Sequence, residues 1–220
     1  MIVTSILAAF GLDAWWGTRA ENERARAQVE ALHAEFSATQ AELTELRASA
    51  ESLRTAVAAI LPLVGPDVDV VPIDSITKLI DRSFRLGTVE LKTGSVQALL
   101  ASGELTAIKS PALKALIAGW PAEVADLRAQ TRLMEENREL IIDYLHDRLP
   151  TLDVAHNTGQ MERYPHSSFS VSAERFQRDM RVEGLFGNRG MMIEDTDRIV
   201  VALHELASQA IQLLREESND

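Results

Sequence analysis

The chain has 220 residues, a formal net charge of −11 and no cysteine. The lack of cysteine excludes disulfides, thiolate chemistry and cysteine-based zinc sites. The acidic balance argues against binding to nucleic-acid phosphates, which requires a basic face. Aromatic residues make up only 5%, so the core must be built mostly from Leu, Ile, Val and Ala. This composition favours helices over strands, and we expect an all-α fold without nucleic-acid partners.

Residues 1–17 form an apolar stretch with one charge, at Asp13. The stretch ends in Trp15 and Trp16, which matches the aromatic belt of a membrane interface. Asp13 would then lie within a helical turn of that interface, where a carboxylate reaches water. We interpret residues 1–17 as a transmembrane anchor in a lipid bilayer, with these three residues at the membrane interface.

The apolar run is shorter than the roughly 20 residues that a spanning helix needs. We therefore expect its first turns to lie upstream of Met1. A signal peptide is disfavoured, because no basic region precedes the apolar run. A buried amphipathic helix remains as the alternative.

The segment from Thr18 to about Leu61 contains neither Pro nor Gly and predicts one long helix. Its apolar residues recur at alternating steps of three and four, as in a coiled coil. The helix could pair with its own copy in a parallel dimer or pack against later helices of the chain. We favour the second alternative, since the rest of the chain supplies enough apolar helix. The seam consists of Val29, Leu32, Phe36, Leu43, Leu46, Leu53, Val57 and Ile60, with Thr39 and Ala50 filling its gaps.

Three short helices are predicted next, separated by breakers. The first runs from about residue 75 to 84, and the second begins at Thr93 or Ser95 and ends at Gly103. Ser110 before a proline predicts the start of a third. The stretch at residues 119–121 (Gly-Trp-Pro) is expected to end that helix and open another. Trp120 indicates either a buried helical corner or a small-ligand pocket.

The start SILAAFGLDAWW, the heptad helix and the stretch TGSVQALLASGELTAIKSPALKALIAGW resemble a group of uncharacterised bacterial membrane-anchored proteins, the DUF6090-like proteins. The resemblance implies a single-pass inner-membrane protein with its domain outside the cytoplasm. It implies no known activity and therefore no catalytic residues. The residues that carry it in the middle stretch are Thr93, Gly94, Leu99, Leu100, Ser102, Gly103, Leu105, Ile108, Leu113, Leu116 and Trp120.

The C-terminal part predicts two more long helices, at about residues 121–149 and 191–217. Between them we expect a loop at 151–170, a helix from Ala173 to about Phe186 capped by Ser172, and a turn at 187–190 (Gly-Asn-Arg-Gly). The acidic tail from Glu216 is expected to fray.

The search for catalytic and metal-binding patterns finds only weak signals. Asp143, His146 and Asp147 share one helical face, and the expectation for them is a solvated helix end. His156 and His166 flank a loop and indicate a possible site with Glu162 and Tyr164. His204-Glu205 begins a zinc-protease pattern, but Ser208 stands where the second histidine must lie. We expect no metal, no cofactor and no enzyme activity.

The sequence thus predicts a membrane anchor at residues 1–17 and a soluble α-helical bundle at 18–220. The leading functional hypothesis is a membrane-tethered interaction or scaffold module. Its partner would be its own copy, through the helix at 18–61, or another envelope protein. The alternative is an envelope sensory or small-ligand-binding helical bundle.

Overall fold

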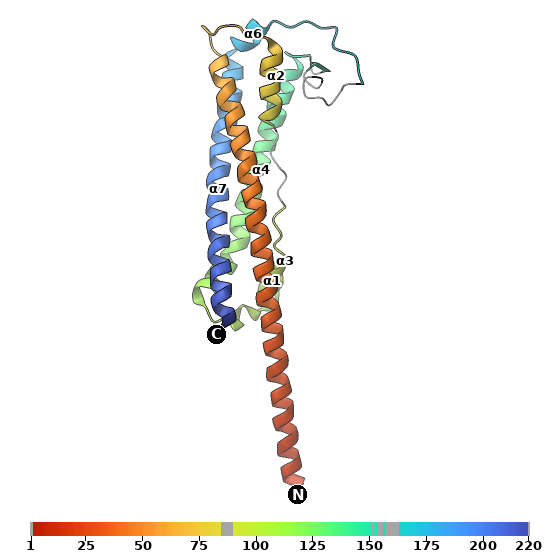
Figure 1. Ribbon diagram of the computed structural model, residues 1–220, viewed down its shortest axis with the longest axis vertical. Coiled ribbons are helices and arrows are strands. Elements are labelled where there is room, and N and C mark those ends of the chain that lie inside the picture. Colours follow the sequence, from red (N-terminus) through yellow and green to blue (C-terminus); the bar gives the residue numbers. More distant parts are fainter. Residues whose placement is uncertain (1, 85–89, 151, 154–155, 157–162, 220) are drawn as a thin grey trace. The chain divides into compact units, whose positions relative to one another are not determined.

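The computed structural model describes residues 2–84, 90–150, 152–153, 156 and 163–219, with side chains described at Arg19 and at residues 23–218 of these ranges. All regular secondary structure in the described ranges is helical (Figure 1), which confirms the all-α prediction. The elements are α1 (Ile2–Ile60), η1 (Leu61–Leu63), α2 (Ile73–Arg82), α3 (Gly94–Ser102), η2 (Glu104–Ala107), α4 (Pro111–His146), α6 (Ala173–Gln177) and α7 (Met180–Asn219).

Helix α1 is one uninterrupted helix that passes through the predicted boundary at residue 17. The backbone of the apolar stretch is helical, but the side chains of Asp13, Trp15 and Trp16 lie outside the described residues. Among the residues that are described, no helix joins enough length to enough apolar character to cross a bilayer. The structure therefore gives the predicted transmembrane span no support.

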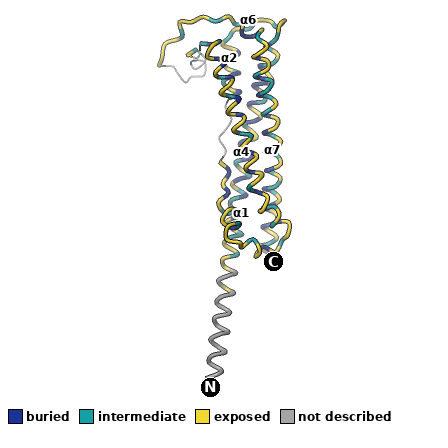
Figure 2. The backbone as a smooth tube through the Cα atoms, turned by 180° about the vertical axis from the view of Figure 1, so that it is seen from behind, coloured by how far each residue is buried: buried dark blue, intermediate teal, exposed yellow. Residues whose placement is uncertain are grey.

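The predicted seam of α1 is confirmed as its buried face. Leu32 is 1% exposed, and burial continues at heptad spacing to Ile60 at 0%. Val29, the first predicted seam residue, is half-buried. Figure 2 shows this alternation of buried and exposed positions along the helix. Because the burial occurs within a single chain, the seam packs against later helices, as favoured from the sequence.

Contacts divide the chain into two compact units. Unit 1 comprises residues 1–41, 91–123 and 204–220. Its core joins α1 to the first turns of α4 through the rings of Phe36 and Trp120, whose centroids lie 4.9 Å apart at 71°. The Gln40 side chain donates a hydrogen bond to Ser208 of α7.

Two carboxylates of unit 1 accept hydrogen bonds from backbone N–H groups at helix starts. Glu35 of α1 accepts from the amides of Ser95 and Val96, in the first turn of α3. Glu217 of α7 accepts from the amides of Lys109 and Ser110, just before α4. Each satisfies donors that a helix start leaves without an intrahelical partner. Helix α7 continues to Asn219, two residues beyond the end at about 217 that the sequence predicts.

Unit 2 comprises residues 42–90 and 124–203, and two apolar clusters lie among its described residues. One joins the end of α1 to α2, α4, α6 and α7, and the other joins α1 to α4 and α7. The first contains Ile60, Val64, Ile76, Ile80, Ile141, Tyr144, Leu145, Leu149, Phe176, Val182 and Phe186, and the second Ala50, Leu53, Val57, Met134 and Ile193.

The predicted helix ends are confirmed at three positions where the local sequence signal is strong. The Ser110 hydroxyl accepts from the amide of Leu113 in the first turn of α4, and the Ser172 hydroxyl accepts from that of Arg175 in α6. Gly103 ends α3 with a φ of 73°, a left-handed conformation that favours glycine.

The predicted break at residues 119–121 is wrong, because α4 continues through Pro121. Proline removes one helical hydrogen bond and usually kinks or ends a helix. Here Ile117, Trp120 and Val124 lie on both sides of it and are each at most 1% exposed. Their burial on one continuous face holds the helix together across the proline.

The predicted turn at 187–190 is also wrong, because α7 runs without a break from Met180 to Asn219. Helix α7 contains three glycines, and each destabilises a helix interior by about 1 kcal/mol relative to alanine. The buried positions nevertheless keep the heptad spacing through this region: Val182, Phe186, Arg189 and Ile193 are each at most 1% exposed. Packing of this face outweighs the low helix propensity.

The continuity of α7 predicts that Gly187→Ala stabilises the protein. A Cβ at Gly187 would meet no atom within 4 Å, so the substitution raises the free energy of unfolding by about 1 kcal/mol. Urea unfolding followed by circular dichroism measures the change. Gly103→Ala is the matched control and should destabilise by about 1 kcal/mol, because its φ is left-handed. A lower free energy of unfolding for Gly187→Ala would contradict the continuous helix and support the predicted turn at residues 187–190.

Candidate functional site

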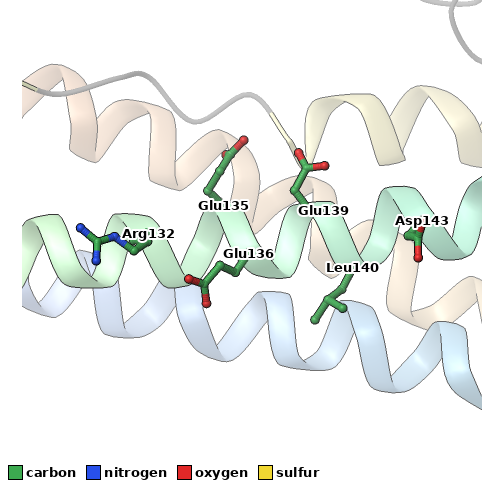
Figure 3. A pocket seen from close by; sticks show the side chains of 6 residues that line it. All are labelled: Arg132, Glu135, Glu136, Glu139, Leu140 and Asp143. Carbon is green, nitrogen blue, oxygen red and sulfur yellow. The ribbon is translucent and has the colours of Figure 1, made fainter.

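The surface of unit 2 carries an open depression of about 590 Å³ along α4. It is lined by Arg132, Glu135, Glu136, Glu139, Leu140 and Asp143. Figure 3 shows Glu136 and Leu140 on one side of α4 and the carboxylates of Glu135 and Glu139 on the other. Because all six residues belong to one helix, the site is an exposed helix face.

The carboxylates of this face differ in their partners. Arg138 pairs with Glu135 and, at 3.6 Å, with Glu139. Within the described part of the chain, neither Glu136 nor Asp143 forms an ion pair. These two carboxylates are exposed, so their charge is available to a partner.

Two leucines on the same helix point outward rather than into the core. Leu133 is 46% exposed and Leu140 is 61% exposed. They are seven residues apart, which places them on one helical face. The sequence analysis did not single out this face. The spacing of Leu133 and Leu140 was the available signal.

The predicted group of Asp143, His146 and Asp147 stays at the surface, where all three residues are exposed. No cluster of three or more metal-ligating side chains occurs among the described residues. The expectation of a solvated helix end fits this placement.

The structure does bring together the two loop histidines. The rings of His156 and His166 stack with centroids 4.2 Å apart, and Nδ1 of His166 lies 3.1 Å from the Asp153 carboxylate. The N–H of Ser167 donates to the same carboxylate and lowers the pKa of Asp153. Of the other predicted members, Tyr164 is 58% exposed and Glu162 lies outside the described residues. Asp153, which the sequence analysis did not single out, orders the pair.

Trp120 is only 1% exposed and packs its ring edge-on against Phe36. Its indole N–H finds no hydrogen-bond acceptor in the described part of the chain. A buried ring in a helix-packing position favours the structural interpretation of this tryptophan over a ligand pocket.

Arg189 of α7 is a fully buried arginine, at 1% exposure, that the sequence analysis placed in a turn. Its guanidinium donates two hydrogen bonds to the carbonyl of Ser83, after α2, and one of 2.6 Å to the carbonyl of Met134 in α4. Burial lowers the pKa of Arg189 to about 10, so the group remains charged at neutral pH. Three segments of unit 2 thus meet at one cation.

Tyr144 of α4 forms a second polar link in unit 2. Its hydroxyl donates a 2.7 Å hydrogen bond to Asp179, the residue before α7. Burial, together with this bond, raises the pKa of Tyr144 to about 12. The same bond, with the N–H of Arg181, lowers the pKa of Asp179. Both shifts favour the neutral phenol next to the charged carboxylate.

Comparisons of the chain with protein-family models, with characterised proteins and with solved structures find no match. The DUF6090-like resemblance, and the function that it implies, therefore stay predictions.

Replacing the buried arginine should unfold unit 2 more easily. Arg189→Ala removes three hydrogen bonds and leaves a cavity, and we expect the free energy of unfolding to fall by about 2–4 kcal/mol. Urea unfolding measures the loss. Arg198→Ala is the control on the same helix, since Arg198 is exposed and pairs only locally with Asp195; it should change stability by less than about 0.5 kcal/mol. Equal effects of the two variants would contradict a bridging role for Arg189.

The link between Tyr144 and Asp179 predicts a pH-dependent effect of Tyr144→Phe. The lowered pKa of Asp179 means that its stabilisation is present at neutral pH and is lost as the pH falls below about 4. Because the pKa of Tyr144 is raised, the stabilisation that its phenol contributes is present below about pH 10 and is lost as the pH rises toward 12. At pH 7 the free energy of unfolding of the wild type should thus exceed that of Tyr144→Phe by about 1–3 kcal/mol.

That difference should shrink at both pH extremes. Urea unfolding of the two proteins from pH 3 to 11 tests this profile. A constant difference across the range would show that the variant acts only through packing.

Proposed function

We propose that the chain is a membrane-tethered helical interaction module. Residues 1–17 attach it to a bilayer, and the helices that follow present surfaces to a protein partner. The observation that supports this proposal most directly is the change of character along α1, which remains a single helix from Ile2 to Ile60.

The segment of α1 between the apolar stretch and the buried seam is mostly polar, and its Gln28 side chain donates a hydrogen bond to Glu104 of η2. Every described side chain from Arg19 to Ala31 is exposed or half-buried, and the first buried residue is Leu32. Arg19 and Glu23 form an i, i+4 ion pair of 3.1 Å along this segment. A helix with a mostly polar surface can bridge two bodies through solvent. Its position supports a spacer between a membrane and the packed helices.

The geometry of this spacer follows from its helical state. At about 1.5 Å per residue, Leu32 lies about 20 Å along the helix axis from Thr18. No Gly or Pro occurs from Thr18 to Ile60, so no breaker interrupts the helix. In this proposal the spacer holds the packed helices a defined distance from the lipid headgroups.

The partner in this proposal is another protein rather than a second copy joined through α1. From Leu32 onward, the seam through which two copies could pair is already buried within the chain. The DUF6090-like resemblance adds the expectation of a single-pass inner-membrane protein with its helices outside the cytoplasm.

Flotation with phospholipid vesicles tests the attachment. Vesicles of phosphatidylethanolamine and phosphatidylglycerol are mixed with the full chain and centrifuged through a density gradient. We expect the wild type to float. Leu7→Asp combined with Phe10→Asp should remain at the bottom, since each buried carboxylate costs about 2.5–3.5 kcal/mol in a bilayer core.

The matched control carries the same kind of change in the spacer. Ala27→Asp with Ala31→Asp adds two carboxylates at exposed positions of α1 and should float as well as the wild type. The proposal would be contradicted if the wild-type chain stayed at the bottom of the gradient, or if both double variants lost flotation equally.

A further inference from the structure

We infer that the outward face of α4 docks a basic amphipathic helix of a partner protein. This face, here called the acidic stripe, consists of Leu133, Glu136, Leu140 and Asp143. The inference rests on the proposed interaction function and names the chemical class of its partner.

The spacing of the acidic stripe is that of a helix-docking seam. Its members follow one another at steps of three, four and three residues, as the a and d positions of a heptad do. The buried residues Met134 and Ile141 lie on another side of the same helix, at 1% and 0% exposure. Helix α4 therefore carries an inner seam that packs in unit 2 and an outer seam that nothing in the described chain covers.

The two leucines supply the apolar contacts for a docked helix. Leu133 and Leu140 are 46% and 61% exposed, and they lie one heptad apart. Leu140 also borders the open depression of about 590 Å³. A partner side chain placed between the two leucines would remove apolar surface from water, as in helix-in-groove recognition.

The charge of the depression determines the kind of helix. Four carboxylates line it, against one cation, Arg132. Two of those carboxylates, Glu136 and Asp143, belong to the acidic stripe itself and form no ion pair in the described part of the chain. Lysine or arginine residues flanking the apolar seam of a partner would complement this charge.

A second copy of the same face is a poor occupant. Pairing two acidic stripes would bring Glu136 and Asp143 of one chain near the same carboxylates of the other, and such like-charge contacts disfavour association. The complementary charge thus points to a different protein with a basic helix.

A charge-swap experiment on the full chain tests the inference. The probe is a fluorescein-labelled peptide of three heptads, with Leu at the a and d positions and Lys at e and g. A second peptide carries Glu in place of Lys. Fluorescence anisotropy follows the titration of each peptide with the full chain in detergent, with empty micelles as background. The wild type should bind the Lys peptide, and salt should weaken that binding.

Two double variants separate the apolar from the charged contribution. Leu133→Gln with Leu140→Gln should weaken binding of the Lys peptide at least tenfold. Glu136→Lys with Asp143→Lys should also lose it and should gain binding of the Glu peptide. Because all four positions are exposed, the variants should keep the circular dichroism spectrum of the wild type.

The matched control reverses two exposed charges elsewhere. Glu183→Lys with Glu205→Lys changes the net charge of α7 by the same amount, and both residues are exposed. This variant should keep wild-type binding within about twofold. If the control variant lost as much binding of the Lys peptide as the acidic-stripe variants, attraction by net charge alone would explain the binding, and the inference would be overturned. Absence of binding by the wild type would also overturn it.

The result is independent of membrane attachment. A chain that binds the Lys peptide through the acidic stripe but fails to float would retain this site and lose the proposed tether. A chain that floats but does not distinguish the peptides would retain the tether and lose this site.

Discussion

The buried guanidinium of Arg189 is the interaction on which the packing of unit 2 most depends. It joins the carbonyl of Ser83 and the carbonyl of Met134 to α7. A guanidinium buried without acceptors would cost free energy, so these hydrogen bonds stabilise the packing of the three segments against one another. The same residue lies among the glycines of α7, where helix propensity is lowest. Its hydrogen bonds and the buried Phe186 and Ile193 around it keep that helix continuous.

Helix α1 imposes the second constraint, because one element carries three environments. Residues 2–17 are largely apolar in sequence, the described side chains from Arg19 to Ala31 are exposed or half-buried, and the seam from Leu32 to Ile60 is buried. A helix transmits position along its axis because its backbone hydrogen bonds are satisfied internally. Whatever binds one end of α1 is therefore held at a set distance from the seam.

Helix α4 combines a structural and an interactive face in the same way. Its inner side supplies Met134, Ile141 and Tyr144 to the core of unit 2, while Leu140 remains exposed beside unpaired carboxylates. Apolar side chains left in water within an acidic surface gain most from a partner that is both apolar and basic. If residues 1–17 attach the chain to a bilayer as proposed, the acidic stripe would recruit such a partner to a membrane surface.

The features that depend on neighbours along the chain could be predicted from local sequence alone. The heptad seam of α1, the caps at Ser110 and Ser172 and the stop at Gly103 follow from local spacing and backbone preference, and all are confirmed. Whether the weak helix signals at Pro121 and at residues 187–190 break a helix depends on packing between helices. There the burial of Trp120, Val124, Phe186 and Arg189 outweighs the local cost. Tertiary structure also decides that Leu133 and Leu140 face solvent and that Asp153 meets His166. Such contacts join residues through packing that no local pattern specifies.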